Sequence, residues 1–141
     1  MSAALFVFLV PVCEMSVKPR ALIVEDEMLV AMLIEDALMD GGFEIMGISS
    51  RVEEAKKLLA LEEQPDVAVM DLNLAGTSAV SIAEYLISVG IPFVIVSGYG
   101  REGLPRHLQN IPMVSKPFNP DRLLQAMRNA LADPPPKSIP R

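Results

Sequence analysis

Four short apolar runs, each followed at once by acidic, hydroxyl or basic side chains, constrain the fold of this chain more than any other feature. In chain order, the runs are Ala21–Val24 before Glu25 and Asp26, Val67–Met70 before Asp71, Phe93–Val96 before Ser97, and Ile111–Ser115 before Lys116. A continuous apolar run of this length is typical of a strand that is buried on both faces of a parallel sheet. Because the carboxyl ends of parallel strands open into one crevice, we expect these polar side chains to converge there.

Helix-forming segments alternate with the apolar runs, and this alternation predicts a doubly wound α/β domain with helices on both faces of the sheet. The expected elements besides the four runs are a strand at 43–48 and helices at 28–39, about 50–61, 77–88 and 120 onwards. Ser50-Arg51-Val52-Glu53 has the form of a capping box, and Asn119 followed by Pro120 is a good helix start.

A full helix is not expected between the last two strands of the sheet. Gly98, Gly100, Gly103 and Pro105 stand close together there, so the sequence allows only a short helix at 105–109. We expect the stretch 98–110 to be mobile. The only histidine, His107, lies in this stretch, and a lone histidine among polar residues is expected to be a solvated side chain.

Composition limits the classes of function. The 141 residues suffice for one domain with a real core, and 18 acidic against 12 basic residues give a formal net charge of −6, so nucleic acid is not expected as a direct partner. The single cysteine forms no internal disulfide, and without a Cys/His cluster no zinc site is expected. A reducing cytoplasm suits this cysteine content.

The two ends of the chain differ from its middle. Residues 1–17 form an N-terminal extension whose apolar stretch 3–10 resembles part of a signal peptide, but it is too short to span a bilayer and no basic residue precedes it. Met15 is therefore considered as an alternative start. Residues 18–133 form the predicted domain, and 134–141 form a proline-rich tail that is expected to be extended.

The converging groups predict a site that binds a divalent metal and handles phosphate. Glu25, Asp26 and Asp71 would bring three carboxylates together, which is unfavourable unless a hard cation such as Mg²⁺ neutralises them. An aspartate carboxylate can attack phosphorus to give an acyl phosphate. Lys116 and the Ser97 hydroxyl would then meet the charge of the transferring phosphoryl group.

In these residues the chain resembles the receiver domain of a two-component response regulator, over about Arg20 to Ala132. The resemblance implies a CheY-like, flavodoxin-like sheet of five parallel strands in the order 2-1-3-4-5. The matching motifs are Leu22-Ile23-Val24-Glu25-Asp26-Glu27, Val69-Met70-Asp71-Leu72-Asn73-Leu74, Ser97 and Lys116-Pro117-Phe118. The implied roles are Glu25 and Asp26 as the metal pair, Asp71 as phosphoacceptor and metal ligand, the Asn73 backbone carbonyl as a further metal ligand, and Ser97 and Lys116 as the conserved hydroxyl and lysine.

The segment around Ser97 resembles an atypical receiver subgroup known as FAT GUY, whose pattern reads roughly P-F-x-F-A-T-G-Y. Here the corresponding stretch is Pro92-Phe93-Val94-Ile95-Val96-Ser97-Gly98-Tyr99. Members of the subgroup have a shortened or poorly ordered fourth helix. Met113 stands where many receivers carry a switching aromatic residue, and Tyr99 either supplies the moving aromatic group instead or packs over the crevice.

No DNA-binding or enzymatic output domain follows in the sequence, so we expect a stand-alone receiver. The resemblance implies that it is phosphorylated on Asp71 by a sensor histidine kinase or a phosphotransfer protein. We expect a signalling domain rather than a dedicated enzyme, and a monomer or weak dimer. On phosphorylation, either its 98–110 surface changes so that a partner binds, or the domain acts as a phosphate sink. Two alternatives remain open. One is an aspartyl-phosphate hydrolase of the haloacid dehalogenase type, which would need a second Asp where Asn73 stands. The other is a pseudo-receiver, a binding or dimerisation module that is not phosphorylated.

Overall fold

The computed structural model describes residues 17–134, and its centre is a five-stranded sheet in the order β2-β1-β3-β6-β7. All four strand pairs are parallel. The strands are β1 (Arg20–Val24), β2 (Glu44–Ser49), β3 (Val67–Met70), β6 (Phe93–Ser97) and β7 (Met113–Ser115). Counted along the chain, this is the order 2-1-3-4-5, so the predicted fold is confirmed. Residues 1–16 of the predicted extension, with the alternative start, and residues 135–141 of the tail lie outside the described residues.

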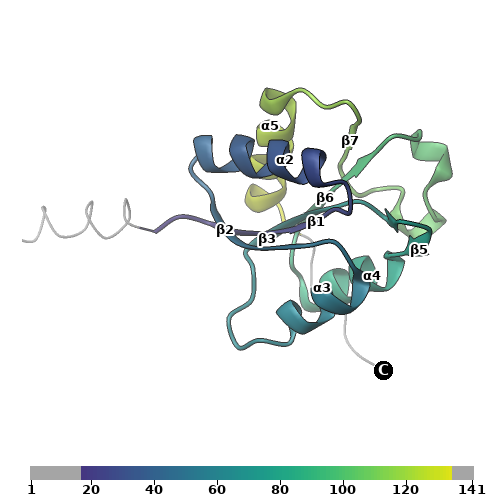
Figure 1. Cartoon of the computed structure of the whole chain (residues 1–141), viewed down its shortest axis with the longest axis horizontal. Coiled ribbons are helices and arrows are strands. Elements are labelled where there is room, and N and C mark those ends of the chain that lie inside the picture. The colour runs from purple at the N-terminus through teal and green to yellow at the C-terminus, as the bar shows by residue number, and fades with distance from the viewer. Residues whose placement is uncertain (1–16, 135–141) are drawn as a thin grey trace, which may run out of the picture.

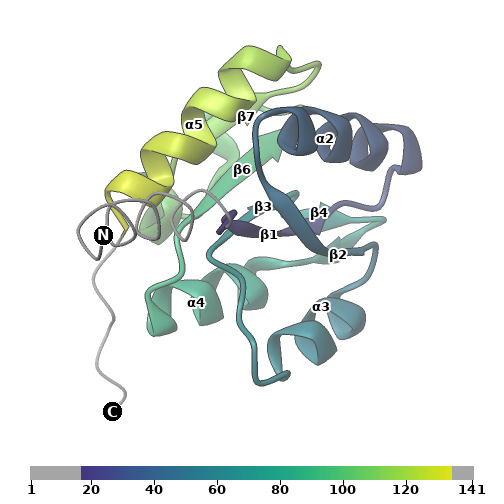
Figure 2. The same cartoon turned by 90° about the vertical axis from the view of Figure 1, so that its left-hand side faces the viewer.

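Two helices cover each face of the sheet. In Figure 1, α2 and α5 lie above the sheet and α3 and α4 lie below it, and Figure 2 shows the same layers from the side. The helices are α2 (Met28–Asp40), α3 (Val52–Leu59), α4 (Val80–Val89) and α5 (Pro120–Ala132). No helix within residues 17–134 is long and apolar enough to cross a membrane.

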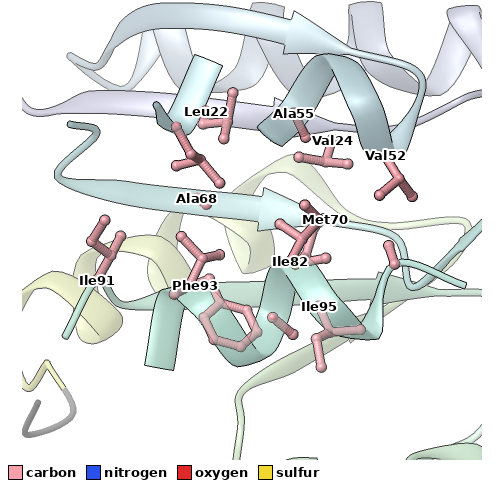
Figure 3. Packing of buried hydrophobic residues seen from close by; sticks show 14 of the residues in the cluster. Leu22, Val24, Val52, Ala55, Ala68, Met70, Ile82, Ile91, Phe93 and Ile95 are labelled. Atoms are coloured by element: carbon pink, nitrogen blue, oxygen red, sulfur yellow. The ribbon is translucent and has the colours of Figure 1, made fainter. Parts of the chain in front are cut away.

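Strand side chains alternate between two hydrophobic clusters, one under each helical layer. Leu22 and Val24 of β1 pack with α3 and α4, whereas Ala21 and Ile23 pack with α2 and α5. Figure 3 shows the first cluster, in which Phe93 lies among side chains from the strands and helices. All residues of β3 are buried, so none of their side chains can reach water or a ligand. The side chain that can do so at the carboxyl end is that of the next residue, Asp71.

Helix ends follow the sequence closely in three places. α2 begins at Met28 and ends at Asp40, just before the glycine pair. α4 ends at Val89, and the next residue, Gly90, caps it in a left-handed conformation with φ 78°. The Asn119 side chain accepts a hydrogen bond of 2.8 Å from the Asp121 N–H and so caps α5.

Two local predictions were wrong. The capping box before α3 does not form, because Arg51 occupies the capping position and Ser50 is bonded instead to Glu54, with both its N–H and hydroxyl 3.3 Å from Oε1. The helix predicted from residue 77 begins at Val80, because a hairpin takes the preceding residues. Its strands are β4 (Asn73–Leu74) and β5 (Thr77–Ser78).

The hairpin turn explains this second difference. Ala75 and Gly76 connect its strands with φ of 53° and 89°, respectively. Two successive residues with positive φ are what a tight two-residue hairpin turn requires. The turn therefore holds the loop after Asp71 in a short antiparallel ribbon, and helix formation starts only after it.

Two 3₁₀ turns replace a helix between β6 and β7, as expected from the glycines. They are η1 (Arg101–Gly103) and η2 (Arg106–Leu108), the second lying within the predicted 105–109 segment. Leu108 is fully buried, and the Arg101 guanidinium donates to the carbonyl oxygens of Gln109 at 2.7 Å and Ile111 at 2.9 Å. His107 is half exposed, with Nε2 3.1 Å from Glu84 Oε2. The expected mobility of this stretch stays a prediction.

Candidate functional site

The polar residues that follow the strands meet at one edge of the sheet, as the sequence predicted. Asp71 directly follows β3, and its backbone N–H donates to the Val24 carbonyl at 2.9 Å. Lys116 directly follows β7, and its N–H donates to the Ser97 carbonyl at 2.7 Å. These bonds extend the parallel ladders one residue beyond the strands, so rigid backbone positions both side chains.

Three carboxylates form a cluster that suits a hard cation. One oxygen each from Glu25, Asp26 and Asp71 lies within 4.8 Å of the others. Glu25 is only 2% exposed, and its Oε1 accepts no hydrogen bond although Lys116 Nζ is 3.1 Å away. A buried carboxylate oxygen normally has a partner. Oxygen-only donors with one such unsatisfied atom fit a Mg²⁺-like ion, which prefers carboxylates, carbonyls and water.

Lys116, which follows the carboxyl end of β7, contacts these carboxylates at the same edge of the sheet. Its Nζ donates to Asp71 Oδ2 at 2.8 Å, Glu27 Oε1 at 3.0 Å and Glu25 Oε2 at 3.2 Å. Burial alone would lower the pKa of Lys116, but the hydrogen bonds to Asp71, Glu27 and Glu25 outweigh it and raise the pKa above its usual value. The lysine is therefore a fixed positive charge beside Asp71.

Burial raises the pKa of the Glu25 carboxyl. Hydrogen bonds from the Glu27 N–H and from Lys116 oppose this shift by favouring the ionised form. The Glu27 N–H lies 3.1 Å from Glu25 Oε2. A buried glutamate that retains cationic and amide partners remains suited to ligate a metal.

The Asp71 carboxylate is oriented through both of its oxygens. Oδ1 accepts a bond of 2.9 Å from the Asn73 N–H, and Oδ2 accepts the bond from Lys116. The Asn73 side chain in turn accepts from the Gly76 N–H at 2.8 Å, inside the hairpin turn. The hairpin thus fixes the loop that positions Asp71. The role of the Asn73 carbonyl as a metal ligand stays a prediction.

Two hollows border Asp71. One of about 480 Å³ lies between Asp71, Ser97 and the loop that carries Leu104, and another of about 430 Å³ lies between Asp71, Asp26 and Lys116. The Ser97 hydroxyl accepts a hydrogen bond of 3.0 Å from the Tyr99 N–H. Each hollow has room for a phosphoryl group next to the carboxylate.

Tyr99 lines both hollows but is 75% exposed, so its ring does not close the crevice in this structure. Met113, at the position of the usual switching aromatic residue, packs against the core cluster of α3 and α4. A switching role for Tyr99 stays a prediction.

Sequence reasoning brought Glu25, Asp26, Asp71, Ser97 and Lys116 together correctly but missed the contact that Glu27 makes with Lys116. The only hint was that Glu27 directly follows the acidic pair. Its side-chain direction depends on how α2 starts, which the sequence does not specify.

Comparison with known proteins agrees with this geometry. A family model described as response regulator receiver domain matches residues 21–128. PdtaR, a transcriptional regulatory protein of Mycobacterium tuberculosis, is 28% identical over 121 residues, which cover 83% of this chain and 58% of that protein. The structure of the response regulator PhyR from Brucella abortus has 34% identity and a TM-score of 0.71, covering 92% of this chain and 56% of that chain. The structure of SdrG from Sphingomonas melonis Fr1 has 31% identity and a TM-score of 0.72, covering 82% of this chain and 97% of that chain.

The chain belongs to the response regulator receiver domain family, the proteins of two-component signalling. The family predicted from the sequence is therefore confirmed. The chain spans about half the length of the curated relatives that it matches.

Proposed function

We propose that this receiver accepts a phosphoryl group on Asp71 from a sensor histidine kinase or a phosphotransfer protein. The observation that carries the proposal is the pairing of the Asp71 carboxylate with Lys116 at 2.8 Å within the acidic cluster of Glu25 and Asp26. A nucleophilic carboxylate, a fixed cation and a cation-binding cluster are the groups that phosphoryl transfer by positioning and electrostatics needs.

The reaction proceeds by attack of an Asp71 carboxylate oxygen on the phosphorus of the donor. The new O–P bond forms as the bond from phosphorus to the donor atom breaks, and the leaving group takes that electron pair. In this proposal, Lys116 and the Ser97 hydroxyl donate hydrogen bonds to the phosphoryl oxygens once the group is bound. Mg²⁺, held by Glu25, Asp26, Asp71 and the Asn73 carbonyl, would neutralise charge and bind a phosphoryl oxygen. This is a signalling domain that is itself modified, rather than a dedicated enzyme.

The test is intact mass after incubation of the wild-type protein with acetyl phosphate, with Mg²⁺ or with a chelator. We expect an adduct of one phosphoryl group that requires Mg²⁺. Borohydride reduction followed by peptide mapping should convert Asp71 alone to homoserine. Absence of an adduct, together with no binding of a beryllofluoride mimic, would reject the proposal and favour a pseudo-receiver that acts through constitutive contacts.

The output of phosphorylation is expected at the surface formed by 98–110. Ser97 immediately precedes this stretch, and the cavity beside Asp71 is lined by Gly100, Leu104 and Pro105. A phosphoryl group that draws the Ser97 hydroxyl toward it acts on the start of this stretch, because the hydroxyl now bonds the Tyr99 N–H. A downstream protein partner would read the changed surface.

Amide hydrogen exchange measures this output. We expect exchange rates within 98–110 to change on addition of beryllofluoride and Mg²⁺, while the amides of β1 and β3 keep their rates as an internal control. Unchanged rates in 98–110 at saturating mimic would contradict the expected output surface.

A further inference from the structure

All three hydrogen-bond donors of the Lys116 ammonium are in use in this structure. A lysine ammonium group has three N–H donors. The acceptors are Asp71, Glu27 and Glu25, at 2.8, 3.0 and 3.2 Å. A phosphoryl group that arrives at Asp71 can receive a hydrogen bond from Lys116 only if one of these acceptors gives up its bond.

Glu27 differs from the other two acceptors. Glu25 and Asp71 belong to the cation cluster, and Glu27 does not. The Glu27 side chain is 61% exposed, compared with 1% for Glu25 and 16% for Asp71. Within the part of the chain that the structure describes, its carboxylate bonds only Lys116. It stands at the capping position of α2 but makes no side-chain cap bond. Glu27 is therefore the acceptor that can leave Lys116 with the least disturbance.

We propose that Glu27 is a positioning residue that holds Lys116 in the unphosphorylated state and is exchanged for a phosphoryl oxygen when Asp71 is modified. This role rests on the proposed function of Asp71. The Glu27–Lys116 pair stabilises the unmodified site, and after modification the Glu27 carboxylate faces a group of like charge. Glu27 thus slows phosphorylation, so the receiver needs a higher concentration of the phosphoryl donor to become modified.

The kinetic test compares Glu27→Gln with wild type in acetyl phosphate and saturating Mg²⁺. Exposed ion pairs are typically worth enough to change a rate roughly two- to fivefold, so we expect the variant to be phosphorylated faster by about this factor. High salt should reduce the difference, because it screens the pair in the wild type.

Two further variants distinguish loss of the Glu27–Lys116 bond from a change in the net charge of the protein. Glu27→Asp keeps the charge but shortens the side chain by one methylene, so it loosens the bond to Lys116 and should also be phosphorylated faster than wild type. Asp36→Asn removes one negative charge from an exposed position farther along α2 and should keep the wild-type rate. A wild-type rate for Glu27→Asp, or an acceleration in Asp36→Asn equal to that in Glu27→Gln, would show an effect of charge alone and would overturn the proposal.

A second measurement is independent of phosphorylation. NMR of the lysine ammonium groups in the unphosphorylated, Mg²⁺-bound protein reports how fast the Lys116 protons exchange with water. We expect faster exchange in Glu27→Gln than in wild type, while Lys56 and Lys57 are unchanged. Equal exchange of Lys116 in both proteins would overturn the proposal.

The outcomes also separate this proposal from the proposed function. If wild type takes up no phosphoryl group, the function of Asp71 is rejected and the role of Glu27 with it, whatever the ammonium exchange shows. If wild type is phosphorylated and Glu27→Gln is equally fast or slower, the role of Glu27 alone is rejected. Urea unfolding of each variant confirms that rates are compared between folded proteins.

Discussion

Replacing Asp71 by asparagine is expected to lower uptake of a phosphoryl group from acetyl phosphate by at least about a thousandfold, because the attacking oxygen is lost. The amide has nearly the size of the carboxylate, so the fold should be unchanged. Its single acceptor oxygen cannot serve both Lys116 and the Asn73 N–H, which bond different oxygens of Asp71. Affinity for Mg²⁺ should also fall, since one of three clustered carboxylates is removed.

The matched control for this variant is Asp66→Asn. Asp66 lies at the other end of the same strand segment, where its Oδ2 accepts a hydrogen bond of 2.7 Å from the Arg20 N–H. The chemical change is the same, but it is made far from the strand ends that form the site. Phosphorylation of Asp66→Asn should equal that of wild type. An Asp71→Asn variant that still gave a full adduct would show that the phosphoryl group resides on another side chain.

The sequence predicted the strands and the residues at their ends because burial on both faces leaves an unambiguous pattern. In β3, all four residues are buried, and no polar side chain interrupts the run until Asp71. The connection order then places Asp71 between the strand ends of β1 and β6. Convergence of the site follows from topology, and no side-chain geometry is needed to predict it.

The hairpin after Asp71 could not be predicted in the same way. The two strands of this hairpin share only two residue pairs, too few to give an alternating pattern, and Thr77 and Ser78 are equally suited to start a helix. The structure resolves the ambiguity through the backbone of Ala75, whose positive φ is rare for a residue with a side chain. The Gly76 N–H then bonds Asn73, and this links the turn to the loop of Asp71.

The hydrogen-bond partners of the side chains at the site also could not be predicted from the sequence. Motif matching places Lys116 near Asp71, but it does not show that Glu25 and Glu27 bond the same ammonium group. The failed capping box at Ser50 has a similar cause. The Ser50 N–H and hydroxyl bond Glu54 rather than Glu53, because α3 takes Arg51 as its N-cap, one residue later than a capping box at Ser50 requires.

The Phe93→Ala substitution is expected to have the largest effect on stability. Phe93 is 2% exposed and packs in the hydrophobic cluster between the sheet and the α3–α4 layer, as Figure 3 shows. Truncating a buried phenylalanine typically costs about 3–5 kcal/mol, from lost transfer free energy and from the cavity that remains. Total stabilities of domains are about 5–15 kcal/mol, so most of the margin could be lost. Urea unfolding monitored by circular dichroism should show a midpoint shifted to much lower urea with little change in slope.

Leu33→Ala provides the comparison for Phe93→Ala. Leu33 is 59% exposed on α2, so its truncation removes apolar surface that already contacts water. Alanine is also a better helix former than leucine, and we expect a change within about 0.5 kcal/mol. Because Phe93 begins the strand that ends at Ser97, its effect on the site should be indirect. Folded Phe93→Ala protein in the cold should still be phosphorylated on Asp71. A small loss of stability in Phe93→Ala, comparable to that in Leu33→Ala, would contradict the packing described for this cluster.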